Sequence, residues 1–355
     1  MDYGVFDHLD RGDLDVHDHY EARLKLIEAY DAAGFYSYHV AEHHFTPLGL
    51  APSPNLFLAS IAQRTKRLRF GPLVYALPLY NPLRMVEEIC MLDQLSRGRL
   101  DMGFGRGSSP IEAAYYGGDP TQAQSVYAEH LEVVLAGLTN ASLDHHGKFS
   151  RFENVPMQLG PFQKPHPPVW YGMHSPDSAE RAARKRFNVV ANGTAAQARA
   201  ASDRFRQVWH EAHADEPLPR IGLVRFLVVG ETDAEALAIA RRAYPQWYRS
   251  FNHLYRLHGR SPMLGERAPD FDALSREGKG VAGTPDKVAD FVHAQMKEAG
   301  ATYFVGQFAF GDLALDEMLQ SLRLFVERVM PVLGSAETVP AGGAQTRVRA
   351  GIAVN

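Results

Sequence analysis

The sequence predicts an α/β fold, namely a (β/α)8 (TIM) barrel formed by a single domain over residues 1–333. Short apolar segments alternate along the chain with longer amphipathic ones, and eight strands each paired with a helix is the number found in such a barrel. The 355-residue length also fits, because these barrels run past about 250 residues as one domain when their loops are enlarged.

The expected elements follow one another in strand and helix order. The strands are expected at residues 3–7, 37–41, 68–76, 100–105, 169–173, 188–191, 221–229 and 303–308. The helices are expected at residues 20–33, 55–64, 83–96, 126–138, 178–185, 195–212, 285–299 and 313–332. In the third helix the apolar residues fall on one stripe that includes Cys90, which is therefore expected in the core. Thr284 and Pro285 predict the start of another helix, as a hydroxyl cap followed by proline at the first helical position.

Two insertions, after the fourth and seventh strands, account for the excess length. Residues 144–168 contain a turn and several prolines, which favour a hairpin followed by an extended crossing. Residues 231–280 begin with a helix expected at 233–244 and continue into an aromatic, basic stretch around Trp247, expected to form a lid or pocket wall. Residues 334–355 lack aromatic side chains, so we expect a flexible C-terminal tail.

The composition predicts a cytoplasmic protein that acts on a small molecule. Lys and Arg (37) nearly balance Asp and Glu (41), which argues against nucleic acid or an anionic membrane as a partner. The N-terminus does not resemble a signal peptide, and no apolar run approaches the roughly 20 residues of a membrane-spanning helix. The single cysteine excludes a disulfide within the chain.

Glu42, His43 and His44 directly follow the second predicted strand. Catalytic groups of such barrels lie at the C-terminal ends of strands, so these three residues are expected at the barrel mouth. An imidazole can give or take a proton near neutral pH, which makes them candidate catalytic residues, with a structural role as the alternative. A metal site is disfavoured because adjacent side chains at a strand end point to opposite sides, although residues 7–21 are rich in Asp and His and could offer ligands.

The segment RLDMGFGRGSSP, residues 99–110, contains the fourth strand. Its alternation places Asp101, Gly103 and Gly105 on one side. If this side faces the barrel interior, a planar ring could approach the backbone closely, and Arg106 at the strand end could bind a phosphate. The alternative is a bulge and tight turn. The segment does not match the dinucleotide-binding fingerprint, and the chain has no P-loop motif.

Ser175, Asp177 and Ser178 lie at the start of the helix after the fifth strand. Free backbone N–H groups at a helix start favour an anion. Capping of the helix explains these side chains equally well. Together with Arg106 they favour a phosphate site.

Four motifs give the chain a resemblance to the bacterial luciferase-like, flavin-dependent monooxygenases, up to about Leu333. They are AEHHF at 41–45, LDQLSRGRLDMGFGRG at 92–107, VWYGMHS at 169–175, and GTPDKVADFV at 283–292 with LFVERVMPVL at 324–333. The resemblance implies an enzyme that takes reduced FMN from a separate flavin reductase and forms a flavin C4a-hydroperoxide with dioxygen. That intermediate would oxygenate a small, apolar organic substrate. A homodimer is also implied.

The resemblance further implies roles for single residues. His43 matches the catalytic histidine of the family, and Glu42 or His44 would orient it. Leu73 and Val74 match a non-proline cis peptide beneath the flavin ring. The remaining matches are Arg106, Ser175 and Ser178 at the flavin phosphate, Glu112 as an acid near the substrate, and Trp247 in the segment that would close the pocket.

Two departures from the luciferase pattern narrow the expected function. Gly105 stands where luciferases carry a reactive cysteine, and His174 stands where they carry a glutamate. Light emission and specificity for long-chain aldehydes are therefore not expected. Three alternatives remain, namely hydride transfer with the deazaflavin F420, flavin binding without turnover, and a metal-dependent hydrolase.

Overall fold

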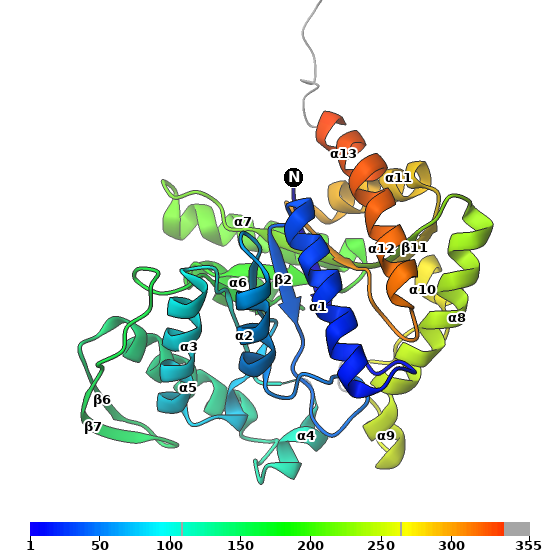
Figure 1. Cartoon of the computed structure of the whole chain (residues 1–355). Coiled ribbons are helices and arrows are strands. Elements are labelled where there is room, and N and C mark those ends of the chain that lie inside the picture. The colour runs from blue at the N-terminus through cyan, green and yellow to red at the C-terminus, as the bar shows by residue number, and fades with distance from the viewer. Residues whose placement is uncertain (108, 263–264, 337–355) are drawn as a thin grey trace, which may run out of the picture.

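The computed structural model describes residues 1–107, 109–262 and 265–336, which form the predicted (β/α)8 barrel (Figure 1). Its parallel strands are β1 (Asp2–Asp7), β2 (Ser37–Val40), β3 (Arg69–Pro72), β4 (Tyr75–Ala76), β5 (Met102–Gly105), β8 (Val169–Gly172), β9 (Asn188–Ala191), β10 (Ile221–Val229) and β12 (Tyr303–Gln307). They are hydrogen-bonded in the order β3-β2-β1-β12-β10-β9-β8-β5-β4.

The third predicted strand is divided into β3 and β4 at the Leu73–Val74 peptide. The ring of strands closes through Phe70, whose N–H donates to the carbonyl of Arg99 at 3.0 Å and whose carbonyl accepts from the N–H of Asp101 at 2.8 Å. Counted this way, the eight predicted strands are confirmed. A further short strand that the sequence did not predict, β11 (Gly280–Gly283), pairs in parallel with the end of β10.

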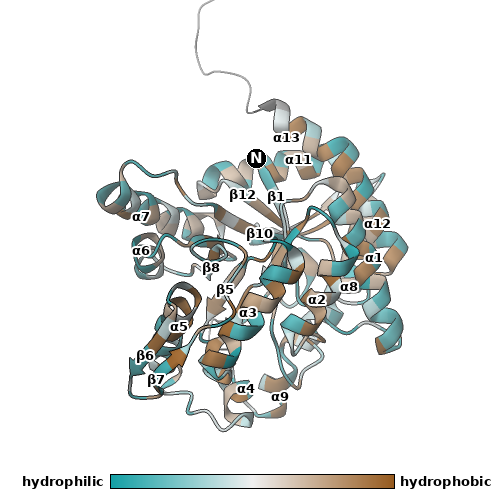
Figure 2. Ribbon diagram, turned by 60° about the vertical axis from the view of Figure 1, so that its left-hand side comes forward, coloured by the Kyte–Doolittle hydropathy of each residue, from teal (hydrophilic) through white to brown (hydrophobic). Residues whose placement is uncertain are grey.

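The eight predicted helices are present, with ends that differ by a few residues. They are α1 (Val16–Ala33), α2 (Pro54–Arg64), α3 (Pro82–Ser96), α5 (Ala123–Thr139), α6 (Pro176–Arg184), α7 (Ala195–His213), α11 (Pro285–Ala299) and α12 (Leu315–Leu324), which continues through a π-helical turn into α13 (Met330–Ala336). The outer helices carry hydrophilic and hydrophobic bands in alternation, as expected of helices that cover a barrel (Figure 2). Of the expected tail, residues 334–336 end α13, and residues 337–355 lie outside the described part of the chain.

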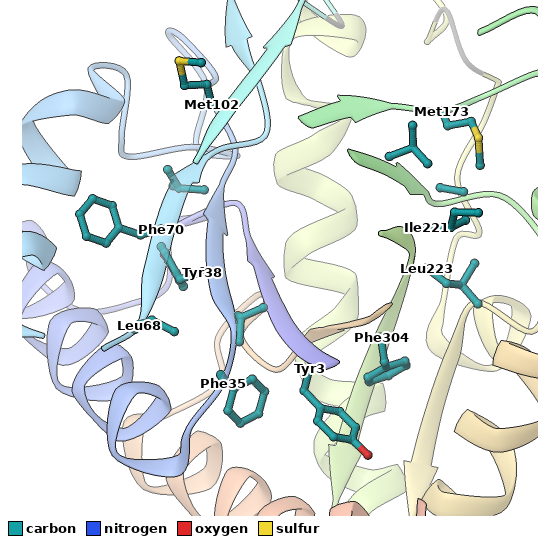
Figure 3. Close-up of a cluster of buried hydrophobic side chains, with 14 of the residues drawn as sticks. Tyr3, Phe35, Tyr38, Leu68, Phe70, Met102, Met173, Ile221, Leu223 and Phe304 are labelled. Carbon is teal, nitrogen blue, oxygen red and sulfur yellow. The ribbon is translucent and has the colours of Figure 1, made fainter. Parts of the chain in front are cut away.

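The main hydrophobic core lies between the strands and the surrounding helices. Leu100, Met102 and Phe104 are fully buried in it, and Figure 3 shows Met102 among the side chains that project from the strands. Gly103 and Gly105, which alternate with these residues, therefore face the barrel interior, as one of the two sequence interpretations required. Cys90 is buried in the same core, as predicted.

The first insertion contains the predicted hairpin, formed by antiparallel β6 (Ser142–His146) and β7 (Arg151–Pro156). The short helix α4 (Pro110–Tyr115) after β5 was not predicted. The predicted start of α11 at Pro285 is confirmed, but the hydroxyl of Thr284 makes no capping hydrogen bond.

The second insertion contains α8 (Asp233–Phe251), α9 (His253–Leu257) and α10 (Phe271–Arg276). The expectation that its first helix ends at residue 244 is wrong, because α8 continues through Pro245. Proline removes one hydrogen bond from a helix interior. Tyr244 precedes Pro245 and Trp247 follows it, and both side chains are buried. This packing keeps the helix continuous.

Candidate active site

A cavity of about 280 Å³ lies at the C-terminal ends of the barrel strands. Eight of the predicted site residues line it, namely Glu42, His43, Leu73, Val74, Gly105, Arg106, His174 and Trp247. Four others do not line it, namely His44, Glu112, Ser175 and Ser178. The Leu73–Val74 peptide is cis, as the resemblance implied.

The imidazole of His43 contacts the carboxylate of Glu112, a residue of α4. The Nδ1 atom of His43 lies 3.1 Å from Oε1 of Glu112, and the other carboxylate oxygen accepts the backbone N–H of His44 at 2.9 Å. An ionised carboxylate only accepts hydrogen bonds, so Nδ1 of His43 carries a proton. Its Nε2 has no hydrogen-bond partner among the described residues and is left as the atom that can act in the cavity.

Glu42 and His44 form a separate buried pair. Nε2 of His44 lies 2.8 Å from Oε1 of Glu42, and the other oxygen of Glu42 accepts from the hydroxyl of Tyr80 at 2.8 Å and the N–H of Ala76 at 3.2 Å. Nδ1 of His44 lies 3.0 Å from the hydroxyl of Tyr116. The expectation that Glu42 or His44 orients His43 is therefore corrected, because the carboxylate in contact with the His43 ring belongs to Glu112.

His8, at the end of β1, is a cavity residue that the sequence did not single out. Its Nδ1 accepts hydrogen bonds from the indole N–H of Trp247 at 3.3 Å and the side-chain amide of Gln307 at 3.2 Å. An indole nitrogen can only donate, so the proton of a neutral His8 is on Nε2. Burial, then the charges of His43 and Arg267, hold the pKa of His8 well below its usual value, so the ring is neutral. The position of His8 directly after a strand was the available signal.

The end of β5 presents backbone and one cation to the cavity. A Cβ atom added to Gly105 would lie only 2.5 Å from Cγ2 of Val74, so this wall has no room for a side chain. The Arg106 guanidinium is exposed and has no ion pair or hydrogen bond with any described residue. Across the cavity, burial and then the charges of Arg267 and Arg106 lower the pKa of His174.

Ser175 and Ser178 form a capping box at the start of α6. The hydroxyl of Ser178 accepts from the N–H groups of His174 at 3.0 Å and Ser175 at 2.9 Å, and it donates to the carbonyl of Ser175 at 2.7 Å. The structure therefore gives Ser178 the capping role that the sequence left as an alternative. Ser175 is exposed beside the cavity wall, and its hydroxyl accepts from the N–H of Ser178 at 3.3 Å.

Within residues 1–107, 109–262 and 265–336, no three His, Cys, Asp or Glu side chains gather closely enough to hold a metal ion. Over the same residues, no helix combines the length and the apolar character needed to cross a bilayer.

A family model and several relatives match the sequence of this chain. The family model described as luciferase-like monooxygenase matches residues 1–303. An uncharacterized protein of Sinorhizobium fredii, y4wF, is 42% identical over 333 residues, which cover 94% of this chain and 97% of that protein. The oxygenase component of the flavin-dependent trigonelline monooxygenase of Acinetobacter baylyi is 30% identical over 193 residues, which cover 53% of each chain.

A solved structure shares the fold. It is the oxygenating constituent of 3,6-diketocamphane monooxygenase from Pseudomonas putida, a type II Baeyer-Villiger monooxygenase in complex with FMN. The TM-score is 0.78 at 21% identity, and the match covers 93% of this chain and 98% of that chain.

Proposed function

The chain belongs to the luciferase-like monooxygenase family, and on that premise we propose that it uses reduced FMN and dioxygen to oxygenate a small organic substrate. One observation carries the proposal. A single cavity at the barrel mouth joins the Arg106 cation, a wall of bare backbone at Gly105, and the paired rings of His8 and His43.

These residues fit a flavin phosphate and ring. Arg106 would hold the phosphate, because an exposed guanidinium with no partner among the described residues is suited to bind an oxyanion through paired hydrogen bonds. The exposed hydroxyl of Ser175 would support it from the start of α6. The flat ring would lie against Gly105 and the Leu73–Val74 peptide, where a side chain on Gly105 would collide with Val74. Reduced flavin supplies the electrons that activate dioxygen.

His43 would then accept a proton, and His8 would donate a hydrogen bond. Nε2 of His43 can take a proton from the reacting groups, and Glu112 stabilises the imidazolium that results. Nε2–H of His8 can donate a hydrogen bond to an oxygen atom, because the indole N–H of Trp247 keeps the His8 proton on that nitrogen. The pair would therefore control protons on one side of the cavity.

An aromatic wall would keep the reacting groups dry. Trp247 stacks on Phe251 at a centroid distance of 5.4 Å, and Phe226 contacts Trp247 edge-on at 4.9 Å. All three side chains line the cavity. Exclusion of water from such a site suppresses side reactions such as the release of hydrogen peroxide.

We expect the reduced flavin to come from a separate reductase in the cytoplasm. The description of the Acinetobacter baylyi relative as an oxygenase component supports a two-component system. The flavin, reduced on the reductase, would reach the cavity by release and diffusion or during a transient contact between the two proteins.

We also expect a homodimer that pairs through α2 and α3. Leu56 on α2 and Met91 and Leu95 on α3 are 75%, 54% and 55% exposed, and exposed apolar side chains on adjacent helices favour association. Sedimentation of the wild type and of Met91→Lys tests this. A wild-type monomer would contradict it.

Anaerobic titration tests the cofactor. We expect reduced FMN to bind more tightly than reduced F420, and Arg106→Ala to weaken FMN binding by roughly 1.5–3 kcal/mol, since hydrogen bonds to a charged group are lost. Arg249→Ala is the control, because Arg249 is exposed on α8, does not line the cavity, and among the described residues bonds only to Gln246. Preference for F420, or equal FMN affinity for Arg106→Ala and the wild type, would contradict the proposal.

A further inference from the structure

A second cation of the cavity, Arg267, is not used by the proposed function. Arg267 lies between α9 and α10, lines the cavity and places its guanidinium 4.9 Å from the centre of the Phe251 ring. Burial lowers the pKa of this guanidinium, while Tyr244, Tyr255 and Glu277 oppose that effect. No carboxylate of the described residues forms an ion pair with it.

The charges around the cavity do not balance. Among the described residues that line it, three side chains are permanently cationic, namely Arg106, Arg267 and Lys279, and one is a carboxylate, Glu42. Glu42 is already engaged by His44, and Lys279 is paired with Glu277 at 2.7 Å. If Arg106 binds the flavin phosphate, Arg267 remains a partly buried charge that no described carboxylate pairs with, which is unfavourable unless a ligand supplies a counter-ion.

A chain of side-chain contacts connects Arg267 with His8, one of the two histidines proposed to control protons. Phe251, on which it lies, stacks on Trp247, and Trp247 donates its indole N–H to His8. The charge of Arg267 also reaches the His8 ring. A group held by Arg267 would therefore bring the attached apolar body against the aromatic wall and close to His8 and His43.

We propose that Arg267 binds the carboxylate of an organic acid, whose apolar body packs on Tyr244, Trp247 and Phe251. The planar guanidinium matches a carboxylate through two parallel hydrogen bonds, and the aromatic side chains supply the apolar contact area. This substrate class rests on the proposed flavin-dependent function, because the acid would be the molecule that the enzyme oxygenates. The sequence led us to expect an apolar substrate. Arg267 changes this expectation to an amphipathic anion.

The test compares carboxylates with their uncharged amides on the protein carrying FMN. Benzoate, phenylacetate, cinnamate and octanoate are each titrated against the corresponding primary amide, with the wild type, Arg267→Met and Arg256→Met. Arg256 is the matched control, because its guanidinium also lies over an aromatic ring, that of Tyr248 at 5.5 Å, but it does not line the cavity. The affinity for FMN is measured for each variant in parallel.

We expect at least one carboxylate to bind the wild type about tenfold or more tightly than its amide, since a charge-assisted hydrogen bond is gained. Arg267→Met should abolish this preference and leave FMN affinity within about twofold, while Arg256→Met should retain it. The inference is overturned if no carboxylate is preferred by the wild type, or if the preference survives in Arg267→Met. A loss of FMN affinity in Arg267→Met with no change in carboxylate preference would assign Arg267 to the flavin phosphate instead. Failure of the wild type to bind FMN at all would contradict the proposed function itself.

Discussion

The imidazole rings of His8 and His43 stack with their centroids 5.9 Å apart, yet they hold their protons on opposite nitrogens. Glu112 keeps the proton of His43 on Nδ1, whereas Trp247 keeps the proton of His8 on Nε2. Both rings line the cavity, and neither Nε2 atom has a hydrogen-bond partner among the described residues, so one is free to accept and the other to donate. A site with both functions on adjacent rings can relay protons without any change of ring orientation.

Replacing Trp247 with Phe tests how His8 is held. Without the indole, Gln307 can present either its NH2 group or its carbonyl to Nδ1, so the tautomer of His8 is no longer fixed. We expect the nitrogen NMR signals of His8 to shift from one tautomer to a mixture, with a loss of about 1 kcal/mol of stability. Trp209→Phe is the control, because the Trp209 indole donates to the carbonyl of Glu216 away from the cavity. An unchanged His8 tautomer in Trp247→Phe would refute this account.

Replacing Glu112 with Gln tests how His43 is held. The amide cannot stabilise an imidazolium as a carboxylate does, so we expect oxygenated product per FMN oxidised to fall about tenfold or more, with FMN affinity unchanged. Hydrogen peroxide should rise to match the missing product. Glu132→Gln, on the exposed face of α5, should behave as the wild type. Full coupling in Glu112→Gln would remove Glu112 from the mechanism.

Replacing Gly105 with Ala tests the close approach at the flavin wall. The new methyl group would meet Cγ2 of Val74 at 2.5 Å, so we expect a loss of about 1–3 kcal/mol of stability together with weaker FMN binding. The double variant Gly105→Ala, Val74→Ala removes the colliding atom and should recover most of the stability. A stable single variant with wild-type FMN affinity would show that the wall has spare room.

The stability of the protein should decrease as the pH falls from about 7 to 5.5. The pKa of His8 lies well below its usual value, and burial lowers the pKa values of His19 and His39 to about 3. Below the usual histidine pKa of about 6.5 the unfolded chain therefore binds protons that the folded chain does not, which favours unfolding. Burial raises the pKa of Asp10 to about 7, so this folded carboxyl binds a proton that the unfolded one releases, and it acts in the opposite direction.

Urea unfolding across this pH range measures the effect. Each histidine contributes up to about 1.4 kcal/mol per pH unit, so His19→Gln should reduce the slope of the unfolding free energy by up to that amount. A slope identical to that of the wild type would mean that His19 titrates normally in the folded protein.

The order of strands and helices could be predicted because it depends on local patterns. The apolar strand at 221–229 and the helix that starts at Pro285 are where the sequence placed them. The end of α8 could not be predicted, because Pro245 is a local signal against a helix that the burial of Tyr244 and Trp247 overrides.

The cavity could be predicted in part for the same reason. His43 and Arg106 follow strands directly, so the barrel rule locates them without knowledge of their partners. The partners of the two histidines depend on contacts between distant residues: Glu112 lies 69 residues from His43, and Trp247 lies 239 residues from His8. No local pattern contains such pairings.

The most direct test of the central claim is to mix the anaerobic complex of the protein and reduced FMN with oxygenated buffer in a stopped-flow instrument. Dissolved oxygen and the spectrum of oxidised FMN are followed together. The account predicts that oxygen is consumed before oxidised FMN appears, because a site that excludes water would retain the oxygen for transfer to a substrate. Simultaneous loss of oxygen and appearance of oxidised FMN, at the rate of free reduced FMN, would contradict a monooxygenase function.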